Sequence, residues 1–114
     1  MLTKKLSEVE KSIPQMQGAE GVHKQVPLSV KDGVPVFSFR VFTIAPGGHT
    51  PYHQHPFEHM NYVIEGSGVL VSADKEHELN KGDFALVLPD EMHQFRNTGK
   101  SDLVIICAVP KEYE

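Results

Sequence analysis

Short apolar or alternating runs, each closed by turn residues, fill the chain from about residue 22 to its end. The run at 34–44 is rich in β-branched and aromatic side chains, which favour strands. Similar runs follow at 60–64, 69–71, 77–79, 84–88, 92–96 and 103–109. Turn signals recur roughly every 8–12 residues and no helical pattern follows residue 20. The sequence therefore predicts an all-β domain, an antiparallel sandwich or barrel.

Two of these runs carry more detailed predictions. The segment 45–48, Ala-Pro-Gly-Gly, is expected to end the strand at 34–44 because glycine and proline mark turns. The segment 84–88, Phe-Ala-Leu-Val-Leu, is apolar throughout. A continuous apolar run of this length predicts a strand that is buried on both faces.

The first 18 residues differ from the rest. Leu2, Leu6, Val9 and Ile13 recur at helical spacing, but Pro14 interrupts the pattern. This segment is either a short helix or an extended arm that lies on a partner. We therefore divide the chain into an N-terminal arm, residues 1–18, and a barrel domain, residues 19–114.

Composition narrows the class of protein. A chain of 114 residues suits one domain, and its single cysteine fits a reducing compartment, so a cytoplasmic location is expected. The formal net charge is -4, from 11 basic and 15 acidic residues, and no basic cluster stands out. Nucleic acid and membranes are therefore not expected partners.

The residues best suited to bind a metal are the histidines. Four of the seven histidines lie between residues 49 and 59, and His93 stands far away in the sequence. His53 and His55 are two residues apart, and Pro56 disfavours helix there, so both rings are expected on one face of an extended segment. Their backbones would lie roughly 7 Å apart, which lets two rings converge on one metal ion. His59 heads the next predicted strand.

These residues carry a family resemblance. Gly47-x5-His53-x-His55-x3-His59-x6-Gly66 resembles the first conserved motif of the cupins, and Gly82-x10-His93-x3-Asn97 resembles the second. The likeness runs from about residue 18 to residue 110. It implies a double-stranded β-helix, the jelly-roll barrel of the cupins.

Two positions depart from the family pattern. His59 stands where cupins usually have glutamate, and in the second motif proline comes one position late, with Asp90 or Glu91 where glycine is common. The first departure resembles a subgroup of small single-domain cupins with four histidine ligands, several of which bind manganese. Carried over by position, the resemblance implies the metal ligands His53, His55, His59 and His93.

The histidine run also allows other interpretations. Glu58 is a rival fourth ligand, but strand alternation allows only one of Glu58 and His59 to face the ion. Residues 55–59 also fit the H-x-x-E-H zinc-protease pattern, which would require a helix through 60–65. The histidines could also be unrelated surface and core residues, and His49, His77 and His23 are interpreted in that way.

The expected cofactor is one divalent transition metal per chain. The resemblance implies Mn or Fe, while imidazole ligands also suit Zn, Ni, Cu or Co. Four neutral imidazoles leave the charge of the ion uncompensated, so an anionic, chelating substrate is expected. An octahedral ion with four protein ligands keeps two positions open, as catalytic sites do. Because imidazole binds metal only when neutral, metal loss is expected below roughly pH 5.

Five residues are candidates for the lining of a pocket beside the metal. Phe95 shares the face of His93, and Ile105 and Cys107 share one face of the last strand, which the family resemblance implies points inward. Cys107 is either close to the metal or a small buried hydrophobic residue, and the second role is favoured. Arg40 is expected to pair with a core carboxylate or to lie exposed. The less favoured alternative is that it anchors an anionic guest. Tyr52 belongs to the rim or the core.

Three functions remain open from sequence. The first is a metal-dependent oxygenase of dioxygenase type that acts on a small anionic or unsaturated organic molecule. The second is a metal-dependent isomerase or lyase, which the lack of an obvious general base weakens, although Glu58 or Glu65 could serve. The third is a non-catalytic small-molecule-binding module. A homodimer is expected, because the strand at 60–64 has apolar residues on both faces.

Overall fold

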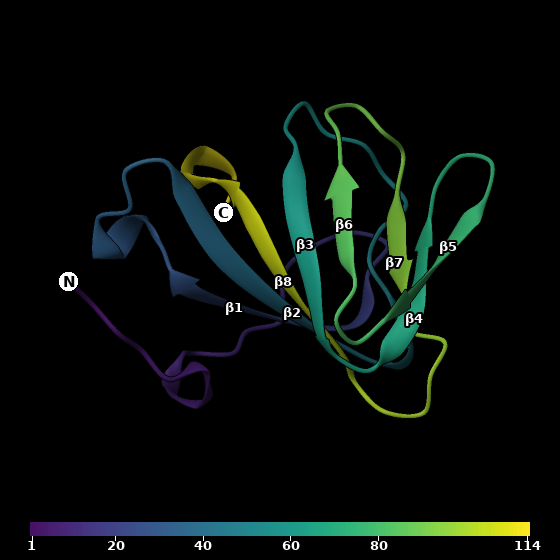
Figure 1. The fold of residues 1–114 in the computed structure, drawn as a ribbon, viewed down its shortest axis with the longest axis horizontal. Helices are drawn as coiled ribbons and strands as arrows, with labels where there is room; N and C mark the ends of the chain where they lie inside the picture. The colour runs from purple at the N-terminus through teal and green to yellow at the C-terminus, as the bar shows by residue number, and fades with distance from the viewer.

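The computed structural model describes all 114 residues, and the chain folds as one curled antiparallel sheet (Figure 1). The strands are β1 (Glu20–Leu28), β2 (Phe37–His49), β3 (His59–Glu65), β4 (Ser67–Val71), β5 (Glu76–Asn80), β6 (Phe84–Val87), β7 (Gln94–Arg96) and β8 (Leu103–Pro110). The only helices are the short 3-10 turns η1 (Leu6–Glu8), η2 (Val30–Asp32) and η3 (Lys111–Tyr113). The predicted all-β double-stranded β-helix barrel is confirmed. No helix has the length and apolar character needed to cross a membrane.

Strand β2 holds the two halves of the barrel together. The strand order is β5-β4-β7-β2-β8-β3-β6, and β1 pairs with β2 outside this path. Residues 37–44 of β2 pair with β8, whereas its last residue, His49, pairs with Arg96 of β7. In Figure 1, β1, β2 and β8 form one side of the molecule, and β4, β5 and β7 form the other. The site described below lies between these halves.

The core comes from alternate positions of nearly every strand, as expected where one face of each strand points inward. Its members are Val22, Ile44, Val63, Leu70, Leu79, Val87, Phe95, Leu103 and Ile105. Ile44 and Leu103 have no exposed surface, and they lie directly across from each other in the β2–β8 register. The β2–β8 pair therefore contributes the most deeply buried side chains of this core.

Strand β2 does not end where the sequence predicts. It continues through residues 45–48 to His49, and this stretch is a bulge in its pairing with β1, whose partner jumps from His49 to Ile44. Gly47 has a φ of 80°, a value that suits glycine. A Cβ on Gly48 would lie 2.6 Å from the Glu20 carbonyl oxygen. The glycines thus bend the strand instead of ending it.

Strand β6 is not buried on both faces, so that prediction is wrong. Val87 is buried, but the Phe84 side chain is 79% exposed and Leu86 is 55% exposed. The reason is position, because β6 ends the strand order and pairs only with β3. Met60 of β3 pairs with Leu86 and is also exposed. We call Met60, Phe84 and Leu86 the outer apolar face.

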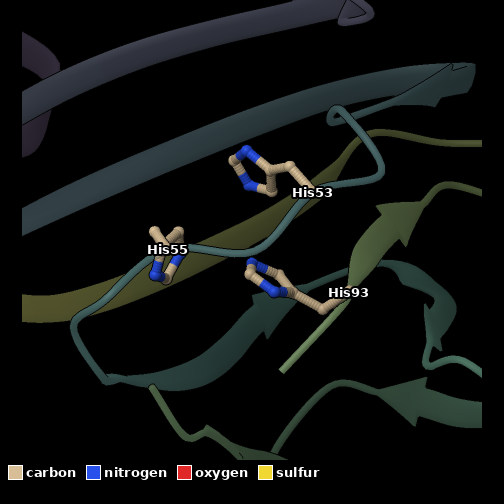
Figure 2. A group of neighbouring side chains, drawn as sticks. All are labelled: His53, His55 and His93. Carbon is tan, nitrogen blue, oxygen red and sulfur yellow. The ribbon is translucent and has the colours of Figure 1, made fainter. Parts of the chain in front are cut away.

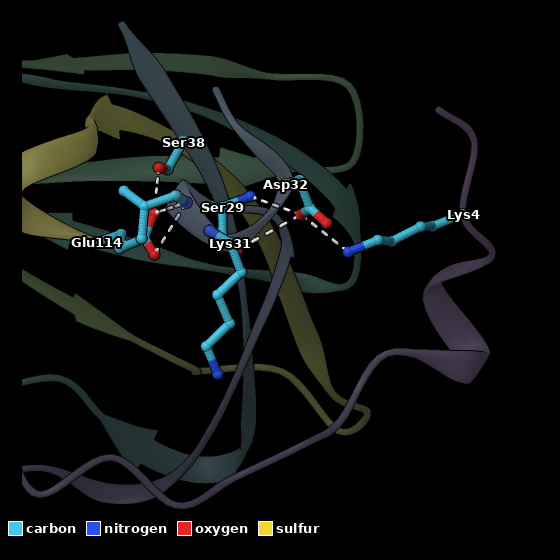
Figure 3. Close-up of polar contacts among 7 residues, drawn as sticks. Lys4, Ser29, Lys31, Asp32, Ser38 and Glu114 are labelled. Carbon is cyan, nitrogen blue, oxygen red and sulfur yellow. Dashed lines mark hydrogen bonds and ion pairs between the residues drawn. The ribbon is translucent and has the colours of Figure 1, made fainter. Parts of the chain in front are cut away.

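The N-terminal arm is extended and lies along its own chain. Residues 6–8 form a single 3-10 turn, and Ser12 makes an isolated antiparallel bridge with Lys24 of β1. The Gln25 side chain donates hydrogen bonds to the carbonyls of Leu6 (2.9 Å) and Val9 (3.0 Å). Lys4 pairs with Asp32 at 2.9 Å, and Asp32 also caps η2 (Figure 3). The arm therefore packs against β1 and η2 of its own chain.

The last residues fold back onto the start of β2. Glu114 accepts hydrogen bonds from the Ser38 hydroxyl, which is fully buried, and from the Val30 backbone N–H (Figure 3). The ring of Tyr113 stacks on Phe57 with 4.0 Å between centroids. The tail thus brings an aromatic ring next to the histidine-rich loop.

Candidate metal centre

Four histidine side chains meet at the inner wall of the barrel. His53 and His93 pair their backbones as an isolated bridge, with N–H···O distances of 3.1 and 2.9 Å. His55 follows His53 in the same extended loop, and His59 begins β3. Figure 2 shows the rings of His53, His55 and His93 turned toward one another. Segments 40 residues apart in the sequence are joined here by the β-bridge.

The ring nitrogens are close enough to share one ion. Donor atoms of His53, His55 and His93 all lie within 4.8 Å of one another. His59 stands beside this group of three, with its Nε2 3.3 Å from Nε2 of His93. The ring centroid of His59 is 5.1 Å from those of both His55 and His93. The structure thus contains a compact group of three histidines and a fourth that adjoins it.

Hydrogen bonds hold three of the rings in the orientation that a metal requires. The Nδ1 of His55 is 2.8 Å from the Phe57 carbonyl, and the Nδ1 of His93 is 2.8 Å from the Glu91 carbonyl. A carbonyl only accepts, so each Nδ1 carries the proton and each Nε2 presents a lone pair. Hydrogen-bonded imidazoles of this kind are typical of metal ligands.

Asn61 holds the His59 ring by its side-chain amide. The Nδ1 of His59 lies 2.9 Å from the Asn61 Nδ2 and 3.1 Å from its Oδ1, and both residues are buried on the inner face of β3. When Nδ1–H donates to this oxygen, Nε2 of His59 points its lone pair at Nε2 of His93. Two lone pairs 3.3 Å apart repel each other unless a cation lies near both. The donor set therefore fits a divalent transition metal.

The electrostatics keep these rings neutral. Burial lowers the pKa of His59 from 6.5 to about 3 and that of His53 to about 4. Burial also lowers the pKa values of His55 and His93. Desolvation disfavours the imidazolium form, and the positive charge of Arg40 adds to this effect at His53, His55 and His59. Neutral imidazole is the form that binds metal.

Asn61 provides a prediction for this geometry. We expect Asn61→Leu to lower metal affinity roughly 10–100-fold, because the His59 ring loses the hydrogen-bond partner that orients it. Competition with a fluorescent chelator measures the affinity. Asn80→Leu, at an exposed position of β5, is the matched control and should leave it unchanged. Equal affinities of wild type and Asn61→Leu would contradict the role of Asn61.

The rival interpretations of the histidine run do not agree with the structure. Glu58 is exposed, whereas His59 is buried, as strand alternation predicts. Residues 59–65 form β3 and not a helix, so the zinc-protease pattern is ruled out. His49 lies outside the cluster, with its Nδ1 3.1 Å from the Thr50 carbonyl, and His77 is exposed. His23 lies on β1, paired with Thr43.

A cavity of about 280 Å³ opens beside the histidines. Its lining contains no aspartate or glutamate and comprises Met16, Arg40, Phe42, Ile44, Thr50, Pro51, His53, His55, Phe57, His59, Asn61, His93, Phe95, Ile105 and Cys107. Four of the five pocket candidates from sequence, Phe95, Ile105, Cys107 and Arg40, are among them. Tyr52 is not: it is 46% exposed, because it alternates with His53 and points away from the cavity.

Arg40 does not have either of its two favoured environments. Its guanidinium has no carboxylate within ion-pair distance, and the side chain is half-buried. It lines the cavity beside Cys107, its register partner on β8. Nη2 of Arg40 donates a hydrogen bond to the Cys107 sulfur at 3.0 Å. The register explains this placement, because Arg40 occupies the same inward row as Phe42 and Ile44. The cavity therefore has a cationic end as well as a histidine end.

Sequence reasoning missed seven of the fifteen lining residues, and three of them, Asn61, Phe57 and Met16, show why. Asn61 could have been found, since it lies two residues after His59 on the same face of a strand. Phe57, whose ring stacks on His55 at 3.8 Å, and Met16 reach the site through loop and arm conformations that have no sequence signal.

Asp90 replaces the usual glycine and has a φ of 63°, so the backbone keeps the conformation that glycine favours.

Comparison with known families agrees with the geometry. The family model described as a cupin domain matches residues 40–109, which include all four histidines. The chain belongs to the cupin family. Curated relatives include Auxin-binding protein 1 from Arabidopsis thaliana, 29% identical over 98 residues, which are 78% of this chain and 50% of that protein. The chain spans about half the length of the curated relatives it matches.

Solved cupin structures resemble the whole barrel. The polyketide cyclase RemF from Streptomyces resistomycificus is 27% identical with a TM-score of 0.92, over 97% of this chain and 80% of that chain. A predicted oxalate decarboxylase from Thermotoga maritima is 25% identical with a TM-score of 0.85, over 96% and 98% of the two chains. These relatives differ in activity, so this cupin's function must be argued from its site.

Proposed function

We propose that this cupin is a divalent-metal-dependent enzyme that acts on a small anionic or unsaturated organic molecule. The observation that carries the proposal is the hydrogen-bonded orientation of His55, His59 and His93, whose Nε2 atoms are directed into a mostly apolar cavity. His53, His55, His59 and His93 would hold the metal, and Mn or Fe is the metal we put first. When bound, such an ion supplies Lewis acidity and exchangeable positions for substrate oxygens.

The chain's own residues prepare the cavity for this chemistry. Phe42, Phe95 and Ile105 form an apolar wall that excludes water from the reacting molecule. No aspartate or glutamate lines the cavity, so no carboxylate is in place to act as a general base. The lining thus weakens an isomerase or lyase that depends on Glu58 or Glu65, since both are exposed. Arg40 adds a fixed positive charge that favours an anionic substrate.

The reaction class we put first is oxygenation of dioxygenase type. It suits a site with four neutral ligands and a mostly apolar cavity without an acid–base carboxylate. The likeness to a polyketide cyclase favours a second candidate, ring closure of a polycarbonyl substrate, in which no oxidant is consumed. The likeness to Auxin-binding protein 1 favours a third, ligand binding without catalysis.

The choice of metal separates these candidates. Protein loaded with Mn or Fe is incubated with diketones, catechols and linear polycarbonyl compounds while oxygen uptake and product mass are recorded. Oxygenation predicts uptake with Mn or Fe and none with Zn, which has no redox chemistry. Ring closure predicts equal turnover with Zn under nitrogen. Tight binding without turnover in any metal form would support the binding module and contradict the enzyme proposal.

We also propose that the protein forms a homodimer through the outer apolar face. Met60, Phe84 and Leu86 leave a contiguous apolar surface uncovered at the end of the sheet. Sedimentation equilibrium at micromolar concentration should give about twice the 12.7 kDa chain mass. Phe84→Glu should shift the protein to monomer, because a buried unpaired charge opposes association. Lys75→Glu, in an exposed turn, is the control, and a monomeric wild type would refute the dimer.

A further inference from the structure

Arg40 is a cation in the cavity wall without an anion to neutralise it. The only ion pairs in the structure are Lys4–Asp32 and His49–Glu20. The Nε of Arg40 is buried and has no hydrogen-bond partner. A half-buried guanidinium without a counter-charge is costly, and a natural protein retains such a group where something gains from it.

The groups around Arg40 do not cancel its charge. Nη2 donates to Cys107 Sγ at 3.0 Å, and Nη1 donates to the Tyr113 carbonyl at 3.5 Å. Burial raises the pKa of the Cys107 thiol, although Arg40 pulls it in the opposite direction, so the sulfur is neutral at pH 7. Glu114 accepts hydrogen bonds from Ser38 and the Val30 backbone and makes no ion pair with Arg40. The positive charge of Arg40 therefore remains available to the cavity.

Sheet register fixes where this charge lies relative to the histidines. Arg40 of β2 is directly opposite Cys107 of β8, and Cys107 is directly opposite Asn61 of β3. Asn61 in turn contacts the His59 ring. Two strand spacings, about 10 Å of backbone, separate Arg40 from Asn61. The two polar ends thus face one cavity, with Cys107 between them in the register and apolar side chains such as Ile105 also in the lining.

We propose that Arg40 binds the anionic end of the substrate and so determines its class. The substrate is a small aromatic or unsaturated molecule with two unlike ends: an oxygen pair that binds the metal, and a separate carboxylate or comparable anionic oxygen group. The planar guanidinium has the donor geometry to hold such a group with two hydrogen bonds. This inference rests on the proposed function, because it takes the metal site at the other end as given.

A matched pair of probes tests the assignment. Zn-loaded protein, which is redox-inert, is titrated calorimetrically with 3,4-dihydroxybenzoate and with its neutral methyl ester. Both carry the same metal-binding oxygens, and only the first carries a carboxylate. Wild type should bind the acid about tenfold or more tightly than the ester, as a charge-assisted contact predicts. Arg40→Met should bring the two affinities within about twofold, mainly by weakening the acid, and Arg40→Lys should fall between.

Controls separate recognition from folding and from failure of the proposed function. Arg96→Met, an exposed arginine on β7, should keep the wild-type preference. Metal content and thermal unfolding of Arg40→Met should match or exceed wild type, since a buried unpaired cation is removed. If Arg40→Met still prefers the acid, the role of Arg40 is overturned and the proposed function is not. Metal-loaded wild type that binds neither probe would overturn the proposed function and, with it, the role of Arg40.

Discussion

His59→Ala is expected to abolish stoichiometric metal binding, whereas Glu58→Ala should leave it intact. His59 is 4% exposed, and its Nε2 is 3.3 Å from Nε2 of His93, whereas the Glu58 side chain points to solvent. Removal of a ligand should cost more than the roughly 10–100-fold in affinity that is lost with a ligand's hydrogen-bond partner. Metal per chain after dialysis, measured by elemental analysis, should fall from about one to a small fraction.

The two outcomes of this experiment have different structural meanings. His53, His55 and His93 alone form a group whose donor atoms lie within 4.8 Å of one another, so a three-histidine site is the structural alternative. In that case His93→Ala would lose the metal and His59→Ala would retain it. If instead Glu58→Ala loses the metal and His59→Ala retains it, the four-histidine assignment is refuted. His49→Ala controls for a nonspecific effect of removing an imidazole nearby.

The histidine cluster could be predicted from the sequence because its rules are local. Alternation in an extended chain places His53 and His55 together and separates Glu58 from His59, and both effects hold in the structure. His93 is different, since only the family resemblance linked it to the others. The bridge that joins it to His53 depends on a strand order that periodicity does not specify.

The errors arise where tertiary context outweighs the pattern. The apolar run of β6 suggests burial on both faces, but β6 ends the sheet order and nothing in the chain covers it. Glycines 47 and 48 suggest a turn, but β1 lies alongside and converts it into a bulge. Arg40 suggests an ion pair or an exposed side chain. Its actual environment follows from its register with Cys107, which no single-strand pattern encodes.

The metal-free protein is expected to lose stability steadily as the pH falls from about 6.5 toward 4. An unfolded histidine has a pKa near 6.5, whereas burial lowers the pKa of His59 to about 3 and of His53 to about 4. In this window the unfolded chain binds more protons than the folded one, so acid favours unfolding. For buried His59 alone, the free energy of unfolding should fall by about 1 kcal/mol per pH unit.

Urea unfolding of metal-free protein at several pH values between 7 and 4 measures this slope. His59→Gln should reduce the slope, because it removes the most strongly perturbed group, while the exposed His77→Gln should leave it unchanged. A flat stability profile across the window would contradict burial of neutral imidazoles. Asp32, whose pKa the Lys4 hydrogen bond lowers below 3.8, adds to acid sensitivity only beneath this window.

The same pKa values bear on the acid limit of metal binding. An ordinary imidazole begins to lose metal to protons near its reference pKa, which is the basis for expecting loss below roughly pH 5. Because burial lowers the pKa of all four rings, protons compete for them at a lower pH than for an ordinary imidazole. The metal should therefore be released only as the barrel unfolds in acid. Tryptophan is absent, so far-UV circular dichroism recorded alongside free metal can show whether the two coincide. Release that precedes the loss of β-structure by a full pH unit would contradict this coupling.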